Sequence, residues 1–175
     1  TRVDGVMLER IRHNGAYESG IYAQGFRLLD ALYMFGMIFA GLLFPLFSKQ
    51  LKESIPAVLD LVKTSANLLL SGVIIIIFVT CYNSAYILGL IYTDFNEAIG
   101  PFQFLMLGFF PICMNFIFGT LLTANGNLKA LNIISLGGIS ANICINLILI
   151  PTHGAFGAAI ATFFTQLVTA ILQFS

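Results

Sequence analysis

The chain has 175 residues, of which 58% are hydrophobic and only 9% are charged. Soluble domains carry about 25% charged residues, so this composition cannot cover a surface that faces water. Eight basic and eight acidic residues cancel, which excludes the basic surface that general nucleic-acid binding needs. The composition indicates an integral membrane protein, with membrane lipid rather than nucleic acid around it.

Long stretches without Asp, Glu, Lys or Arg locate the membrane crossings. They cover 31–48, 64–93, 98–128 and 130–175. A helix crosses the hydrocarbon core with about 20 apolar residues, and an isolated strand there would leave its backbone groups without hydrogen bonds. We therefore expect an all-α fold, a polytopic transmembrane helix bundle.

The expected helices follow one another with short polar breaks. Pro56 suits the first turn of the helix after a basic loop over 49–54, and Pro111 predicts a kink inside its crossing. The turn residues from Pro151 to Gly154 divide the last charge-free stretch into two crossings. The predicted helices are 1–12 (the end of a crossing), 16–47, 58–80, 98–124, 128–150 and 156–174, with a short interfacial helix over 85–92.

Both ends of the chain look cut. Thr1 is not an initiator Met and no apolar signal sequence follows it. The other end, at Ser175, stops inside an apolar run. We therefore expect residues 1–175 to form a single transmembrane lobe of a longer protein.

The basic residues predict an orientation. Lys49, Lys52 and Lys129 fall on one side of the membrane, whereas the loops over 94–97 and 151–154 carry no Lys or Arg. Basic loops are retained in the cytoplasm, so the lysine side is expected to be cytoplasmic. Arg10 and Arg12 fall on the outer side and argue mildly against this orientation.

Four charged residues are candidates for a function inside the membrane. Arg27 and Asp30 are three positions apart and share a helix face. At that depth ionisable groups usually face a bundle interior or a wet cavity, but if the membrane begins after Asp30 the pair is an interfacial salt bridge. Arg2 and Asp4 point in different directions around their helix, and a helix-end role and a cavity role are equally open for both.

Other polar residues predict packing rather than chemistry. Asn142 and Asn146 share one face of an apolar helix, where amides mostly bond to neighbouring helices, with contact to a substrate as the alternative. The three cysteines are dispersed and form no disulfide or metal pattern. His13 and His153 are isolated, and catalytic motifs are missing from the sequence. We expect no enzyme, no cofactor and no metal site.

Six short segments in a fixed order carry a resemblance to a known family. They are RVDxxML from Arg2, GIYAxxxRL from Gly20, LFPxxS from Leu43, ANGNxK from Ala124, NIxxNLxxIP from Asn142 and GxxGAAxAT from Gly154. Together they resemble polysaccharide flippases of the O-antigen type, in the multidrug/oligosaccharidyl-lipid/polysaccharide exporter superfamily. The later segments look like that family's C-terminal lobe.

The resemblance implies the second six-helix lobe of a two-lobe transporter, with its first helix truncated and the N-terminal lobe of the same chain missing. Such proteins move a lipid-pyrophosphate-linked oligosaccharide across the bacterial inner (cytoplasmic) membrane by alternating access, for cell-surface polysaccharide biosynthesis. The resemblance also implies that Asp4, Arg27 and Asp30, and less directly Arg2, line the central cavity and serve substrate binding or coupling.

The charges of Arg27 and Asp30 predict how these two residues would act. Arg27 suits bidentate recognition of the pyrophosphate, and Asp30 would hold Arg27 in the absence of substrate or take up a proton. The nearby candidates for contacting sugar are Tyr17, Tyr22, Gln24 and Tyr33. Two alternatives stay open: a multidrug exporter of the same superfamily, whose cationic substrates favour an acidic cavity, and a non-transporting membrane scaffold of a polysaccharide assembly complex.

Overall fold

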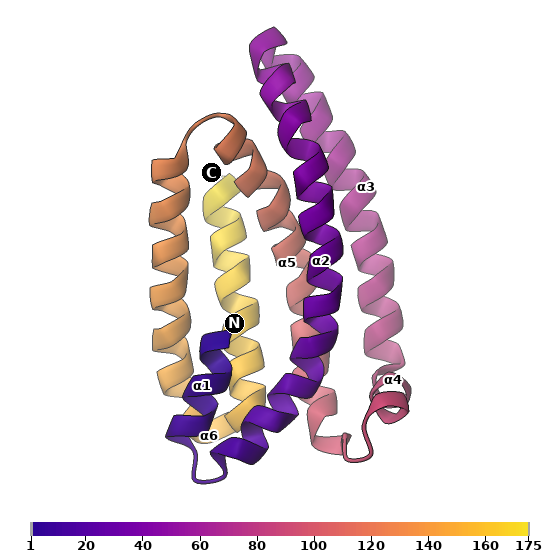
Figure 1. The fold of residues 1–175 in the computed structure, drawn as a ribbon, viewed down its shortest axis with the longest axis vertical. Coiled ribbons are helices and arrows are strands. Elements are labelled where there is room, and N and C mark those ends of the chain that lie inside the picture. Colours follow the sequence, from indigo (N-terminus) through magenta and orange to yellow (C-terminus); the bar gives the residue numbers. More distant parts are fainter. Residues whose placement is uncertain (1, 175) are drawn as a thin grey trace.

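A computed structural model describes residues 2–174, except for the side chain of Arg2. Figure 1 shows an elongated bundle of helices, and the described part contains no strand. The all-α prediction is therefore confirmed. The elements are α1 (Arg2–Ile11), α2 (Gly15–Glu53), α3 (Ile55–Tyr82), α4 (Ser84–Ile91), the 3-10 turn η1 (Asn96–Ala98), α5 (Ile99–Ala124) and α6 (Leu128–Phe174).

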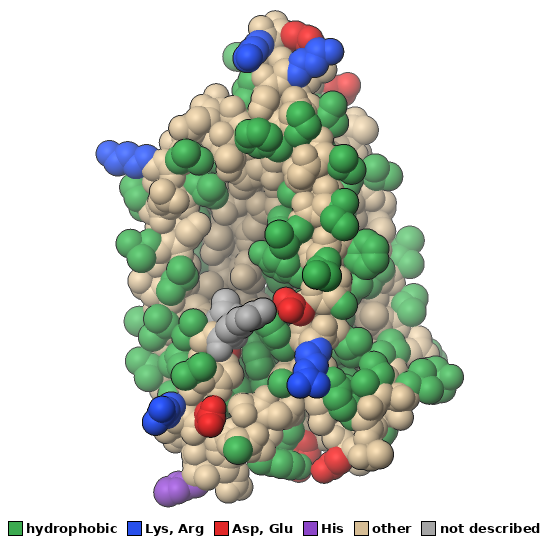
Figure 2. Space-filling model, viewed as in Figure 1, with side chains coloured by type: hydrophobic (Ala, Val, Ile, Leu, Met, Phe, Trp, Pro, Cys, Tyr) green, Lys and Arg blue, Asp and Glu red, His purple; other side chains and the backbone are tan. Residues whose placement is uncertain are grey.

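The bundle has the dimensions and the surface of a membrane-embedded protein. Within residues 2–174, four helical stretches are long and apolar enough to cross a membrane, namely α2, α3, η1 with α5, and α6. Large apolar side chains point outward from them: Phe35 on α2 is 70% exposed and Phe78 on α3 is 72% exposed. Hydrophobic side chains cover much of the face in Figure 2. Such a surface fits lipid and not water.

The loop predicted over 49–54 is wrong, because α2 stays helical through Glu53. Lys49 and Glu53, one turn apart, form an ion pair of 3.8 Å on the last turn of α2. Only Ser54 is extended, and its hydroxyl accepts a hydrogen bond from the Ala57 N–H at 3.4 Å. Pro56 lies in the first turn of α3, as predicted. One residue therefore ends one long helix and caps the next.

The last two predicted crossings form one element with a sharp bend. α6 leaves helical geometry at Gly154, where φ is 55° and ψ is −132°. Figure 1 shows its two halves, orange and yellow, running side by side in opposite directions. The predicted helices 128–150 and 156–174 lie in these halves. The turn predicted between them is confirmed, although Pro151 itself remains helical.

Helix α5 is the one around which the others pack. It contacts α2, α3 and α6, and its side chains Phe102, Leu105, Met106 and Phe109 are buried. Because these neighbours approach α5 from different directions, hollows run along the seams between them. Two kinds of hollow result, one lined by polar side chains and one by apolar side chains.

The turns divide into two groups at opposite ends of the bundle. The α2–α3 junction, which follows Lys52, and the α5–α6 turn, which precedes Lys129, lie at the upper end in Figure 1. The loop before α5 and the bend of α6 lie at the lower end. The grouping of loops predicted from the sequence is confirmed, whereas the end that faces the cytoplasm stays a prediction.

Cysteine labelling tests that orientation. In a background in which the three native cysteines are replaced by alanine, Asn96→Cys and His153→Cys should react with a membrane-impermeant maleimide added to intact cells. Lys52→Cys and Lys129→Cys should react only after the membrane is opened. All four positions are exposed, so access to the reagent depends on the side of the membrane. Labelling of positions 52 and 129 in intact cells would reverse the orientation.

Candidate functional site

A buried carboxylate lies where four helical segments meet. Asp4 on α1 is 0% exposed. Its Oδ2 accepts hydrogen bonds from the hydroxyls of Tyr22 (2.8 Å) and Thr162 (3.0 Å). Its Oδ1 accepts one from Asn146 Nδ2 (2.7 Å), which also reaches Asn142 Oδ1 at 3.1 Å. We call these five residues the Asp4 cluster.

Two chain reversals assemble this cluster. The turn between α1 and α2 brings Asp4 against Tyr22, and the bend at Gly154 brings Asn146 in the first half of α6 against Thr162 in the second half. The amide of Asn146 therefore bonds across to another helix, which is the role predicted for it from the sequence. Residues 142 and 146 share a helix face because they are four positions apart.

The hydrogen bonds of Asp4 hold several segments together. A carboxylate buried this deeply is costly unless hydrogen bonds compensate for the lost water, and α2 and both halves of α6 supply such bonds here. Asp4 therefore ties α1 to α2 and to both halves of α6.

A second set of polar contacts ties the α1–α2 turn to the bend of α6. Arg12 and Glu18 form an ion pair of 3.2 Å. Arg12 Nη1 donates to the Pro151 carbonyl at 2.8 Å, and Glu18 Oε2 accepts from the Ala155 N–H at 2.8 Å. The N–H groups in the first turn of a helix lack partners within that helix. Glu18 thus caps the second half of α6 from another helix, and we call this arrangement the Arg12–Glu18 clasp.

Arg27 and Asp30 differ in their surroundings. Both side chains are exposed, and no ion pair joins them in the part of the chain that the structure describes. Asp30 lines a cavity of about 220 Å³ together with Tyr33, Thr162 and Gln166. Thr162 also belongs to the Asp4 cluster, so one hydroxyl connects Asp4 with the cavity of Asp30. The side chain of Arg2, the fourth candidate, lies outside the described part.

The four residues expected to contact sugar also lie in different surroundings. The Tyr22 hydroxyl is bound to Asp4, and Gln24 Nε2 donates to the Asp94 carbonyl at 3.0 Å, which fastens α2 to the loop before α5. Tyr17 lies near that loop, away from Asp30. Of the four, only Tyr33 lines the cavity of Asp30, where its ring packs on Phe116 with centroids 4.8 Å apart.

The sequence did not single out a larger polar cavity next to Asp30. Its volume is about 380 Å³, and it lies between α1, α5 and the two halves of α6, with Gln166 shared between both cavities. Figure 2 shows this face of the molecule hollowed between its two sides. In the sequence, the only sign of this cavity is a set of amides and hydroxyls scattered among apolar residues. The cavity-lining polar residues are Asn115, Ser135, Asn142, Thr165, Gln166, Thr169 and Gln173.

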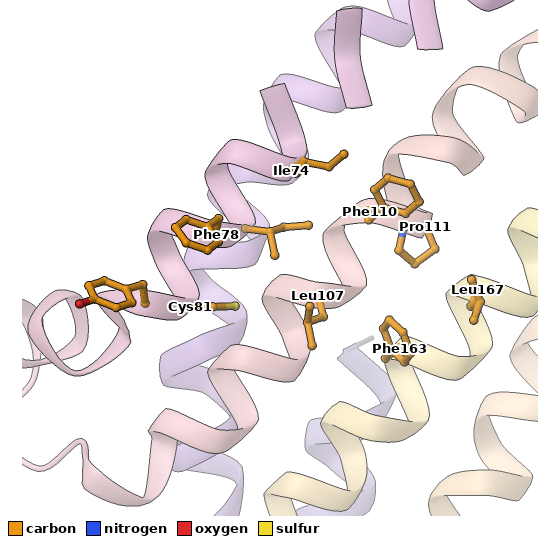
Figure 3. Close-up of a pocket in the computed structure, with 10 residues that line it drawn as sticks. Ile74, Phe78, Cys81, Leu107, Phe110, Pro111, Phe163 and Leu167 are labelled. Carbon is orange, nitrogen blue, oxygen red and sulfur yellow. The ribbon is translucent and has the colours of Figure 1, made fainter. Parts of the chain in front are cut away.

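An apolar groove of about 670 Å³ lies between α3, α5 and α6. Figure 3 shows Phe78 of α3, Phe110 and Pro111 of α5, and Phe163 of α6 around it. Cys81 is half-buried at one edge, with its Sγ 3.8 Å from the Gln103 carbonyl. The groove fits hydrocarbon chains and has no cluster of polar groups to act on a substrate.

The chain was compared with the families of known proteins, with curated proteins and with solved structures, and none of them matches it.

Proposed function

We propose that this chain is the second six-helix lobe of a flippase that moves lipid-pyrophosphate-linked oligosaccharides across the bacterial inner membrane. The transported unit would enter from the cytoplasmic leaflet and leave in the periplasmic leaflet by alternating access, to supply cell-surface polysaccharide. The N-terminal lobe of the same protein would close the central cavity. The proposal rests on the motif order in the sequence and on one feature of the fold.

That feature is the pair of adjoining polar cavities inside an apolar bundle. Polar groups within a membrane are costly, and they mark pathways for polar cargo. The cavity of Asp30 is connected through Thr162 to the fully buried Asp4. A cargo site would thus lie one hydroxyl away from a group able to carry a coupling charge. A purely structural scaffold has no need of this arrangement.

Deletion and complementation in the native bacterium test the function. We expect loss of the protein to lower surface polysaccharide by roughly tenfold or more and to leave lipid-linked repeat units in the cytoplasmic leaflet. The full-length protein should restore both. Unchanged polysaccharide together with increased sensitivity to lipophilic cationic drugs would instead indicate the multidrug exporter. That alternative draws support from Asp30, because the described walls of its cavity carry this acidic residue and no basic one.

Substitutions at Arg27 test its proposed contact with pyrophosphate. Arg27→Lys keeps the charge but loses the planar fork, so it should reduce transport, and Arg27→Ala should reduce it further, by roughly tenfold to a hundredfold. Surface polysaccharide and membrane abundance are measured together, with Lys52→Ala as the control, because Lys52 is exposed at an end of the bundle.

The double variant Arg27→Ala with Asp30→Ala separates two roles for Arg27. If these residues only neutralise each other, removing both should restore much of the transport that Arg27→Ala loses. If Arg27 binds phosphate, the double variant should stay inactive at normal abundance. Normal polysaccharide in the single variant Arg27→Ala would remove Arg27 from the mechanism.

A further inference from the structure

The polar cavity of about 380 Å³ contains hydrogen-bond acceptors that have no partner. Asn115 Oδ1, Thr165 Oγ1 and Gln173 Oε1 are buried and accept no hydrogen bond in the described structure, and all three residues line the cavity. Thr165 as a whole is only 7% exposed. Buried polar atoms in proteins nearly always have partners. Water can serve them in an empty site, but a ligand that displaces the water must bring donors of its own.

Hydrogen bonds between α5 and α6 and along α6 leave acceptors on these residues unused. Asn115 Nδ2 donates to Gln166 Oε1 at 2.8 Å and to the Gln166 carbonyl at 3.2 Å, so its Oδ1 is left for another group. Thr169 uses its hydroxyl proton on the Thr165 carbonyl at 2.8 Å, which leaves its oxygen as an acceptor. Thr165, Thr169 and Gln173 are four residues apart and therefore form a row on one face, about 6 Å between neighbours.

The charge of the cavity limits what it can hold. None of its described lining side chains is Asp, Glu, Lys or Arg. A carboxylate or a phosphate would bring a charge that none of the described lining side chains balances. Hydroxyl groups bring donors and need no counter-charge. The volume lies within the range of small-molecule sites, about 300–1,000 Å³.

We propose that this cavity binds the uncharged, hydroxyl-bearing sugars of the lipid-linked substrate, and that Asn115, Thr165 and Gln173 select them against acidic sugars. This proposal rests on the flippase function and adds the chemical class of the cargo to it. The pyrophosphate would bind elsewhere, on the α2 side that carries Arg27. The selecting residues act by accepting hydrogen bonds from sugar hydroxyls.

The test compares two lipid-linked repeat units in a bacterial host whose own flippase is deleted. One repeat unit contains only neutral sugars and the other contains a hexuronic acid, each made by a defined set of glycosyltransferases. The full-length protein is expressed at matched abundance, and surface polysaccharide of each type is measured. We expect the neutral repeat unit to be exported at least roughly tenfold better than the acidic one. Export of neither would contradict the flippase function itself, and equal export of both would overturn only the sugar assignment.

Substitutions of residues that line the cavity test whether the preference for neutral sugars comes from it. Thr165→Val replaces a hydroxyl with a methyl group of similar size and should lower neutral export roughly five- to tenfold, whereas Thr165→Ser should retain export. Thr80→Val is the matched control, because the Thr80 hydroxyl is bound to the Ile76 carbonyl at 2.7 Å on α3, outside the cavity. Gln173→Lys adds a cation and should raise export of the acidic repeat unit. No change of preference in Gln173→Lys, or full activity in Thr165→Val, would overturn the proposal.

Discussion

If the protein has the proposed flippase function, Asp4→Asn is expected to leave it in the membrane and to lower transport by roughly tenfold to a hundredfold. Hydrogen bonds to a charged group contribute about 1.5–3 kcal/mol, and Asp4 accepts such bonds from Tyr22, Thr162 and Asn146. An amide keeps one acceptor oxygen but turns an N–H₂ group toward either Asn146 or the two hydroxyls, all of which are donors here.

Measuring transport together with membrane abundance distinguishes a role of Asp4 in transport from a purely structural role. Asp4→Ala removes the acceptor and should also lower abundance, because buried donors lose their partner at a cost of about 1–3 kcal/mol each. Asp60→Asn on α3 is the matched control, because Asp60 is exposed and should tolerate the same change. Export of surface polysaccharide at the wild-type level by Asp4→Asn would assign the cluster to packing alone.

Gly154→Ala should destabilise the protein by about 1–3 kcal/mol, the range for a residue forced into a sparsely populated backbone conformation. The φ of 55° and ψ of −132° at this bend are accessible mainly to glycine. A Cβ there would also meet the Glu18 carboxylate, with 2.6 Å to its Cδ. Glu18 cannot yield freely, because it is bound to the Ala155 N–H and to Arg12. The measurement is thermal stability of the purified full-length protein in detergent, followed by size-exclusion chromatography.

Gly137→Ala provides the comparison within the same helix. A Cβ at Gly137 meets nothing within 4 Å, and alanine is about 1 kcal/mol more favourable than glycine in a helix interior. Its melting temperature should therefore stay equal or rise, whereas that of Gly154→Ala falls. If both variants melt at the wild-type temperature, the bend does not depend on glycine and the clasp is not a fixed structure.

The crossings could be predicted from the sequence because the lengths of charge-free runs report directly on the thickness of a bilayer. The turn at Pro151 to Gly154 was predictable for a local reason, since proline restricts the backbone and glycine permits conformations closed to other residues. The helical structure of residues 49–53 was not predictable, because polar residues occur on solvated helices as well as in loops. The extended backbone of Ser54 and the hydrogen bond from the Ala57 N–H to its hydroxyl show where the chain turns.

The candidate site was predictable only in part, because its partners are remote in the sequence. Arg27 stood out as a charge within a helix, yet the structure leaves its side chain exposed. For Asp4 a helix-end role and a cavity role were equally open, and the structure buries it fully, with Thr162, 158 positions away, bonded to it. No local pattern reports such a contact. Asn115 and Gln166 escaped notice because single amides in apolar helices usually join helices to one another.

Helix α2 is longer than a membrane is thick. Its 39 residues, at about 1.5 Å each, extend about 58 Å along the helix, well beyond a hydrocarbon core of about 30 Å. One end is fastened by the Arg12–Glu18 clasp and Asp4, and near the other end Leu43 and Phe47 belong to one apolar cluster with residues of α3. A tilt of about 5° over that length would move the far end by about 5 Å, and it would carry the packed end of α3 with it.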